Sequence, residues 1–126
     1  MMKTQAKANA GEEICKIVCF NEELVNDIKD SMIAEAELQD LAEFYKLLGN
    51  PSRLKIIFAL GKGELCVCDV AHILGLSIPA TSQQLKLLRQ RGLLGHRNDG
   101  RMSYYSLAKP RLFEAIQGDV AFVEKS

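Results

Sequence analysis

The feature that most constrains the fold is a stretch, residues 69–92, whose apolar spacing predicts two helices joined by a tight turn. Gly75 lies between the two helical patterns, and glycine readily adopts the left-handed backbone conformation that such a turn requires. The second helix is expected to begin near Ser77 or Ser82 and to be closed by Gly92. This segment is therefore expected to form a helix-turn-helix.

After this stretch the spacing of apolar residues changes from helical to alternating. Residues 93–98 and 102–107 are short runs of strand-forming residues, separated by Asp99-Gly100. Asp-Gly is a strong signal for a hairpin turn, because both residues tolerate positive φ angles. We therefore expect a short β-hairpin, or wing, after the second helix.

The second helix of the pair separates its side chains onto two faces. Ile78, Thr81, Leu85 and Leu88 recur at helical spacing and are predicted to point inward. The opposite face is polar, and its glutamines and lysine are residue types that bond base edges or phosphates in DNA. The residues predicted to point outward are Pro79, Gln83, Lys86 and Gln90.

Further helices are expected on both sides of the helix-turn-helix. Asn21 can cap a short helix, a longer helix follows it, and Asn50-Pro51 begins a third. Lys109-Pro110 opens a last helix with an apolar stripe that a small domain would best bury against a partner. That stripe consists of Leu112, Ile116, Val120 and Val123.

Charge is distributed unevenly, although the net charge of the chain is zero. Residues 11–44 hold ten acidic side chains against two lysines, whereas residues 77–111 hold seven basic side chains against one acid. A basic block of this kind can bind a polyanion even in a neutral protein. The seven bases are Lys86, Arg89, Arg91, Arg97, Arg101, Lys109 and Arg111.

Length and composition limit the architecture. A chain of 126 residues, 48% hydrophobic, can build one small core, and we expect it to dimerise. No apolar run is long enough to span a membrane or to act as a signal peptide, so a cytoplasmic protein without a membrane partner is expected. Residues 1–20 have little apolar periodicity and are expected to be a flexible arm, with residues 21–126 forming the domain.

The four cysteines form two close pairs, Cys15 with Cys19 and Cys66 with Cys68. In a reducing compartment a disulfide framework is not expected, so the pairs suggest metal binding. Cys66 and Cys68 would point to opposite sides of a regular helix, and they can share one ion only at the start of a helix. A helix N-terminus also favours the thiolate form. Four thiolates suit soft ions such as cadmium, lead and zinc.

Two other interpretations of the cysteines remain open. Each could be a small buried hydrophobe, or the pairs could form a thiol-disulfide switch. The spacing is not that of a C-x-x-C redox motif. We find no nucleophile motif, no phosphate-binding glycine loop and no paired acids in this sequence, and we therefore predict neither an enzyme nor an organic cofactor.

Three motifs together resemble the ArsR/SmtB family of metal-responsive repressors. They are Glu64-Leu65-Cys66-Val67-Cys68-Asp69, the run at 84–93, and Asp99-Gly100-Arg101 leading into the run at 104–107. With the cysteines of the arm, the likeness is closest to the CadC-like branch, which responds to cadmium, lead and zinc. The resemblance implies a mainly α, homodimeric winged helix-turn-helix that binds operator DNA without metal and releases it on metal binding.

The sequence and the resemblance together give a set of expected site residues. Metal is expected at Cys15, Cys19, Cys66 and Cys68. Arsenite as the inducer, or thiol oxidation as the signal, are the alternatives to a divalent metal. The expected contacts to double-stranded operator DNA come from the second helix and the wing, namely Ser77, Thr81, Ser82, Gln83, Gln84, Lys86, Arg97 and Arg101.

Overall fold

The computed structural model describes residues 21–125 and divides the chain into two units, residues 1–41 and 42–126. Helix α3, Glu35–Leu48, includes residues of both units. The expected arm, with Cys15 and Cys19, lies outside the described residues.

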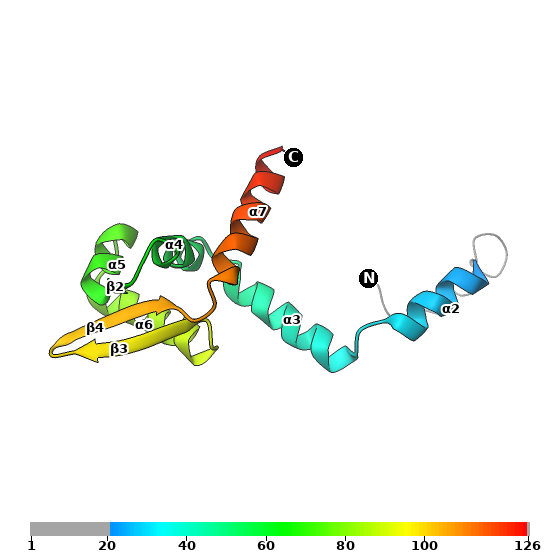
Figure 1. Cartoon of the computed structure of the whole chain (residues 1–126), viewed down its shortest axis with the longest axis horizontal. Coiled ribbons are helices and arrows are strands. Elements are labelled where there is room, and N and C mark those ends of the chain that lie inside the picture. Colours follow the sequence, from blue (N-terminus) through cyan, green and yellow to red (C-terminus); the bar gives the residue numbers. More distant parts are fainter. Residues whose placement is uncertain (1–20, 126) are drawn as a thin grey trace. The chain divides into compact units, whose positions relative to one another are not determined.

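The described part of the first unit contains helix α2, Glu22–Ser31 (Figure 1). Its start is set by Asn21, whose side-chain oxygen accepts a hydrogen bond from the Leu24 amide at 3.1 Å. Glu22 and Glu23 in the first turn face the positive end of the helix dipole. The helix predicted from the Asn21 cap is confirmed, and none of its residues is buried.

Helix α4, Pro51–Leu60, begins as its sequence predicts. Pro51 occupies the first helical position, and the Asn50 side chain accepts a hydrogen bond from the Arg53 amide at 3.2 Å. Ile56 and Ile57 are fully buried, so α4 supplies the centre of the core of the second unit.

The predicted helix-turn-helix is formed by α5, Val67–Leu74, and α6, Ile78–Gln90. Gly75 lies between them with φ of +69°, a left-handed conformation that glycine adopts without strain. Ser77 caps α6 by accepting a hydrogen bond from the Ala80 amide at 3.2 Å. Of the two serines considered as the start of the helix, Ser77 is therefore the cap.

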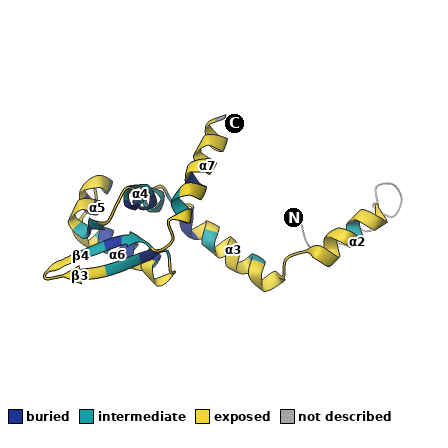
Figure 2. Cartoon of the chain, viewed as in Figure 1, coloured by how far each residue is buried: buried dark blue, intermediate teal, exposed yellow. Residues whose placement is uncertain are grey.

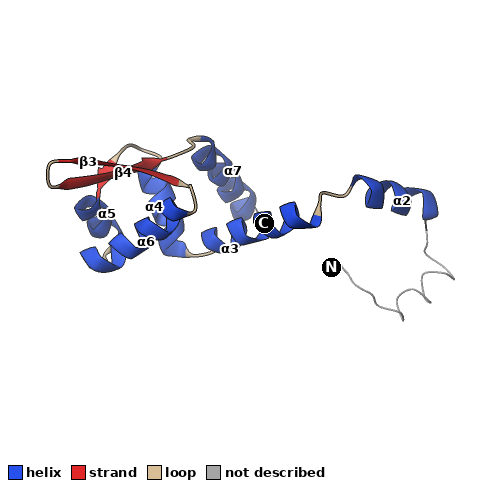
Figure 3. Ribbon diagram, turned by 90° about the horizontal axis from the view of Figure 1, so that it is seen from below, coloured by secondary structure: helices blue, strands red, loops and turns tan. Residues whose placement is uncertain are grey.

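Three strands form a small antiparallel sheet in the order β2-β4-β3. Figure 3 shows β3 and β4 side by side. Strands β3, Leu94–Asp99, and β4, Met102–Leu107, make the predicted wing, but its two-residue loop is Gly100-Arg101 rather than Asp99-Gly100. Asp99 pairs with Met102, and Gly100 takes the positive φ of +63° at the first loop position. Strand β2, Leu65–Cys66, was not expected, because two residues form a strand only through their pairing with β4.

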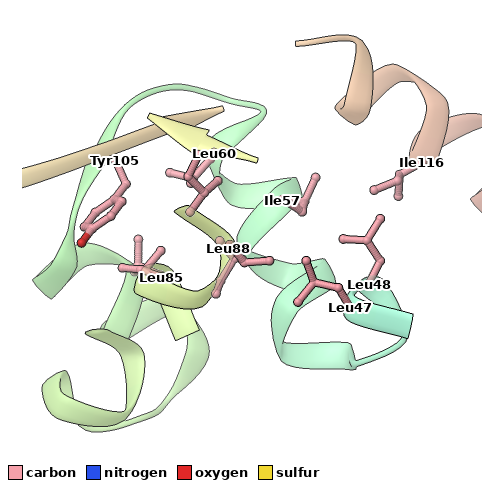
Figure 4. Packing of buried hydrophobic residues seen from close by; sticks show 11 residues of the cluster. Leu47, Leu48, Ile57, Leu60, Leu85, Leu88, Tyr105 and Ile116 are labelled. Carbon is pink, nitrogen blue, oxygen red and sulfur yellow. The ribbon is translucent and has the colours of Figure 1, made fainter. Parts of the chain in front are cut away.

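The last helix, α7, spans Arg111–Lys125. Ile116 from its predicted stripe is buried, whereas Val120 and Val123 are exposed. The core joins the end of α3, helices α4, α5, α6 and α7, and the two wing strands (Figure 4). Its buried members are Leu47, Leu48, Ile56, Ile57, Leu60, Val70, Leu85, Leu88, Leu94, Tyr105 and Ile116.

This arrangement is a winged helix-turn-helix, mainly α with a small β-hairpin, as the sequence predicted. In the part of the chain that the structure describes, no helix is long and apolar enough to span a lipid bilayer.

Candidate nucleic-acid interface and thiol pair

The inner face of α6 is formed by Thr81, Leu85 and Leu88, all fully buried. The prediction that Ile78 belongs to this face was wrong, since its side chain is 51% exposed. Ile78 is the first helical residue, one turn before Thr81, and the buried stripe begins only at Thr81.

The outer face of α6 is exposed, as predicted. Gln83 and Lys86 lie on it, Ser77 is exposed at its N-terminal end, and Ser82 is half-buried at its border. These side chains combine amide, hydroxyl and ammonium groups, which can bond base edges and phosphates. The geometry therefore leaves four of the six expected α6 residues accessible to a ligand that approaches this face.

Thr81, unlike these four residues, lies in the interior of the protein. Its side chain is fully buried, and its hydroxyl donates a hydrogen bond to the Ser77 carbonyl at 2.8 Å. A group that is fully buried and already bonded cannot reach a DNA base without rearrangement of the helix. This burial argues against a direct DNA contact by Thr81, which is therefore not part of the proposed DNA surface.

Gln84 lies on the flank of α6 and is half-buried. Its side-chain oxygen accepts a hydrogen bond from the Nε–H of Arg53 at 3.1 Å. The same oxygen would be needed to bond adenine in a bidentate manner. In this arrangement one of the two lone pairs of the Gln84 oxygen is already used by Arg53, which restricts how the side chain can turn toward DNA.

Arg97 and Arg101, the two wing arginines, lie in different surroundings. Arg101 is exposed in the hairpin loop. Arg97 donates from Nε and Nη2 to the two carboxylate oxygens of Glu64, each at 2.9 Å, and its guanidinium lies 4.6 Å from the centre of the Tyr104 ring. These hydrogen bonds hold the pKa of Glu64 below its usual value and raise the pKa of Arg97. Arg101 is thus the freer of the two for phosphate binding.

Cys66 and Cys68 lie at the start of α5, where the sequence placed them. Cys66 is the N-cap residue, with an extended backbone, and its side chain is buried. Cys68 is the second helical residue and is exposed. The predicted helix start at Asp69 was two residues late, so Cys68 is inside the helix rather than before it.

The start of α5 carries two sulfur atoms, one on the N-cap residue and one on the second helical residue. The Cys66 side chain makes no capping hydrogen bond to the first turn. Among the described residues, no group of three or more His, Cys, Asp or Glu side chains is placed to hold a metal ion. Cys66 and Cys68 can supply at most two sulfur ligands, and the other expected pair, Cys15 and Cys19, lies outside the described residues.

Comparison with known proteins identifies the family. Residues 50–95 match the profile of the bacterial regulatory proteins of the arsR family. The cadmium resistance transcriptional regulatory protein CadC of Listeria innocua is 36% identical over 114 residues, which cover 90% of this chain and 95% of CadC. The chain belongs to the ArsR/SmtB family and resembles its CadC-like members.

Two further comparisons support the sequence relationship and the fold. The transcriptional repressor SmtB homolog of Synechocystis is 37% identical over 108 residues, covering 86% of this chain and 82% of the homolog. A homodimeric winged helix-turn-helix DNA-binding domain from Mycobacterium bovis superposes with a TM-score of 0.65 at 29% identity. The superposition covers 76% of this chain and 95% of the M. bovis domain.

Two residues of the site were missed by sequence reasoning. Arg53 bonds Gln84 and Glu64 bonds Arg97, across 31 and 33 positions of the chain. Neither pair has a local pattern, since both depend on how α4, α6 and the sheet pack. The one available signal was that Glu64 is the first residue of the motif that contains Cys66 and Cys68, and no such signal marks Arg53.

Proposed function

We propose that this protein is a metal-responsive transcriptional repressor that binds operator DNA as a dimer and releases it when a soft divalent ion binds its cysteines. Cadmium, lead and zinc are the proposed inducers. The observation that carries this proposal is the position of Cys66. This residue belongs to β2, which pairs with wing strand β4, and it also caps α5, which packs against α6.

The proposed DNA surface is the exposed face of α6 together with the tip of the wing. Gln83 and Lys86 would lie in the major groove, with Ser77 and Ser82 near the backbone at the start of the helix. Arg101 at the hairpin loop would bind phosphate beside it. Gln84 and Arg97, which also belonged to the expected set, are bonded within the protein and would have to release those partners to contact DNA fully.

The cysteines are connected to both parts of this surface. Cys66 is directly opposite Tyr104 in the β2-β4 pairing, and Arg97 of β3 is opposite Tyr104 on its other side. A shift of Cys66 would therefore act on β4, the central strand of the sheet. Because Cys66 is also the N-cap residue of α5, the same shift would change how α5 supports α6. A bound soft ion would supply one thing, a cross-link between thiolates at this point.

Dimerisation is supported by apolar side chains that the second unit leaves exposed. Tyr45 of α3 is 61% exposed, and Val120 and Val123 of α7 are 41% and 67% exposed. Figure 2 shows most of α7 in the colour of exposed residues. Apolar groups of this kind are expected to be covered by a partner. A second copy of this chain is the proposed partner, as in the homodimeric M. bovis domain. Two copies would present two α6 helices to successive major grooves.

The proposal is tested by measuring DNA binding with and without metal in cysteine variants. A duplex selected from a random library by the unaltered protein serves as the operator, and binding is followed by fluorescence anisotropy under reducing conditions. Cys66→Ser and Cys68→Ser are expected to bind this duplex like the parent and to lose release by cadmium. Such release would require a coupling of about 3–5.5 kcal/mol in the parent.

Cys15→Ser and Cys19→Ser test whether the arm contributes ligands to the site. His72→Ala is the matched control, because His72 is an exposed residue of α5. The control should release DNA on cadmium addition like the parent. If all four serine variants still release DNA, the cysteines are not the sensor. If oxidant releases DNA from the parent and cadmium does not, the thiol-redox alternative replaces the proposal.

Arsenite is distinguished from a divalent metal ion by the number of cysteines that bind it and by their geometry. It binds three thiolates in a pyramid, so one of the four cysteines would be dispensable, whereas a four-sulfur divalent site needs them all. Thiolate-to-metal absorption during anaerobic titration of the four serine variants reports which cysteines bind each ion.

A further inference from the structure

Arg53 makes three hydrogen bonds, and the two from its side chain join α4 to other helices. Its backbone amide bonds Asn50 at the start of α4. Its Nη1–H group donates to the carbonyl of Leu47 at 3.1 Å, near the end of α3, and its Nε–H group donates to the side-chain oxygen of Gln84 at 3.1 Å, in the middle of α6. One half-buried guanidinium therefore connects α3 and α4 with the helix proposed to read DNA.

Both acceptors, the Leu47 carbonyl and the Gln84 side-chain oxygen, depend on Arg53 for a hydrogen-bond donor. In a continuing helix the Leu47 carbonyl would accept from the amide four residues later, but that residue is Pro51, which has no N–H. Gln84 is half-buried, and its amide oxygen costs free energy if it is left without a partner. Because guanidinium is planar and rigid, it holds two acceptors in a fixed relation that a lysine cannot reproduce.

We propose that Arg53 is a positioning residue for operator binding, which fixes α6 relative to the end of α3 through Gln84. This inference rests on the proposed function, and it adds that sequence-specific binding depends on a residue that does not itself contact DNA. Non-specific binding depends mainly on phosphate charge, so it should tolerate a small misplacement of α6. Specific binding requires side chains to meet base edges in register and should not tolerate it.

The obvious alternative is that Arg53 binds a phosphate directly. A phosphate contact would contribute to every duplex alike, and its loss would lower the salt slope of binding by about 0.9. A positioning residue would leave the salt slope unchanged and would weaken only the selected operator duplex.

The experiment compares Arg53→Met, Gln84→Met and the double variant on the selected duplex and on a scrambled duplex of the same composition, across a range of salt concentrations. Each single variant is expected to bind the selected duplex about tenfold more weakly, the loss typical of a charge-assisted hydrogen bond. Binding to the scrambled duplex and the salt slope should stay at the parent's values. The double variant should lose no more than either single variant, because both break the same bond.

Lys55→Met is the matched control, since Lys55 is an exposed cation on the same helix. It removes the same charge without touching Gln84, and it should leave the ratio of specific to non-specific affinity unchanged. Arg53→Lys should recover part of that ratio. If Arg53→Met fails to fold, as judged by circular dichroism, Gln84→Met takes its place because it leaves the bond to Leu47 intact.

Additive losses, a reduced salt slope, or an unchanged affinity ratio in the single variants would overturn the inference. Release by metal does not enter this assay, so failure of the sensing mechanism would leave it intact. If the parent selects no sequence at all, the proposed sequence-specific DNA binding fails. Nitrogen-15 NMR then tests only whether the hydrogen bond between Arg53 and Gln84 forms. In that case the Arg53 Nε–H signal of the parent should be protected from exchange and should lose its protection in Gln84→Met.

Discussion

The ring of Phe113, in the first turn of α7, occupies the space that a side chain on Gly61 would need. A Cβ atom built at Gly61 would collide with three carbons of that ring. The Phe113 ring also packs edge-on against the Phe58 ring, with 5.8 Å between the ring centres. The Lys62 Nζ atom lies 5.9 Å from the centre of the Phe113 ring. The absence of a side chain at the end of α4 therefore allows α7 to pack there.

Gly61→Ala is expected to destabilise the protein by about 1–3 kcal/mol, because the added methyl group must displace Phe113 or α7. Urea denaturation measures this change. Gly118→Ala is the matched control, since Gly118 lies within α7 and nothing surrounds its Cβ position. Alanine there should stabilise the helix by about 0.5–1 kcal/mol. Equal effects at the two positions would contradict the packing explanation.

Thr81→Val tests whether Thr81 has a packing role. Valine has nearly the same shape but lacks the hydroxyl that bonds Ser77, so a loss of about 0.5–1.5 kcal/mol in the free energy of unfolding is expected. Affinity for the selected duplex should be unchanged, because the side chain is fully buried. A large loss of affinity with unchanged stability would restore Thr81 to the DNA contacts.

The Glu64–Arg97 pair predicts a dependence of stability on pH. The hydrogen bonds from Arg97 lower the pKa of Glu64 in the folded protein, so the pair stabilises the fold above the usual pKa of glutamate. This contribution is lost as the pH falls through the lowered pKa. The difference in urea midpoint between the parent and Glu64→Gln should therefore shrink as the pH is lowered from about 6 to about 3.

Arg97→Gln should give the same pH dependence as Glu64→Gln, since either change removes the same pair. Because both side chains are exposed, the effect should be small and should weaken with added salt. A midpoint difference that is constant over this pH range would show that the pair does not contribute.

Gln83 and Arg101 are expected to affect DNA binding in different ways. Gln83→Ala should weaken binding to the selected duplex by about 1–3 kcal/mol and relax its sequence preference, because base contacts carry specificity. Arg101→Ala should weaken all duplexes alike and lower the salt slope by about 0.9, because it removes one phosphate contact. Anisotropy titrations on selected and scrambled duplexes separate the two. The same pattern for both variants would mean that one of these roles is misassigned.

Local sequence is enough to specify the elements that depend on neighbouring residues. The caps Asn21, Asn50 and Ser77 place the starts of three helices through a bond to an amide three residues later. Gly75 and the hairpin glycine, Gly100, mark turns that require positive φ. The spacing of Cys66 and Cys68 gave only a condition, that they can share one ion at the start of a helix, and the helix start predicted at Asp69 was two residues late.

The packing of the helices and the sheet sets which of these side chains are available to a ligand. Thr81 and Ile78 share a helical stripe in the sequence, yet one is fully buried and the other is half-exposed, because the packing of α6 begins one turn after its start. Gln84 and Arg97 are polar residues in a basic segment, and both are bonded by partners more than thirty positions away. Strand β2 exists only through its pairing with β4. Local propensity fixes short-range bonds, whereas burial and long-range pairs depend on how the helices and the sheet pack against one another.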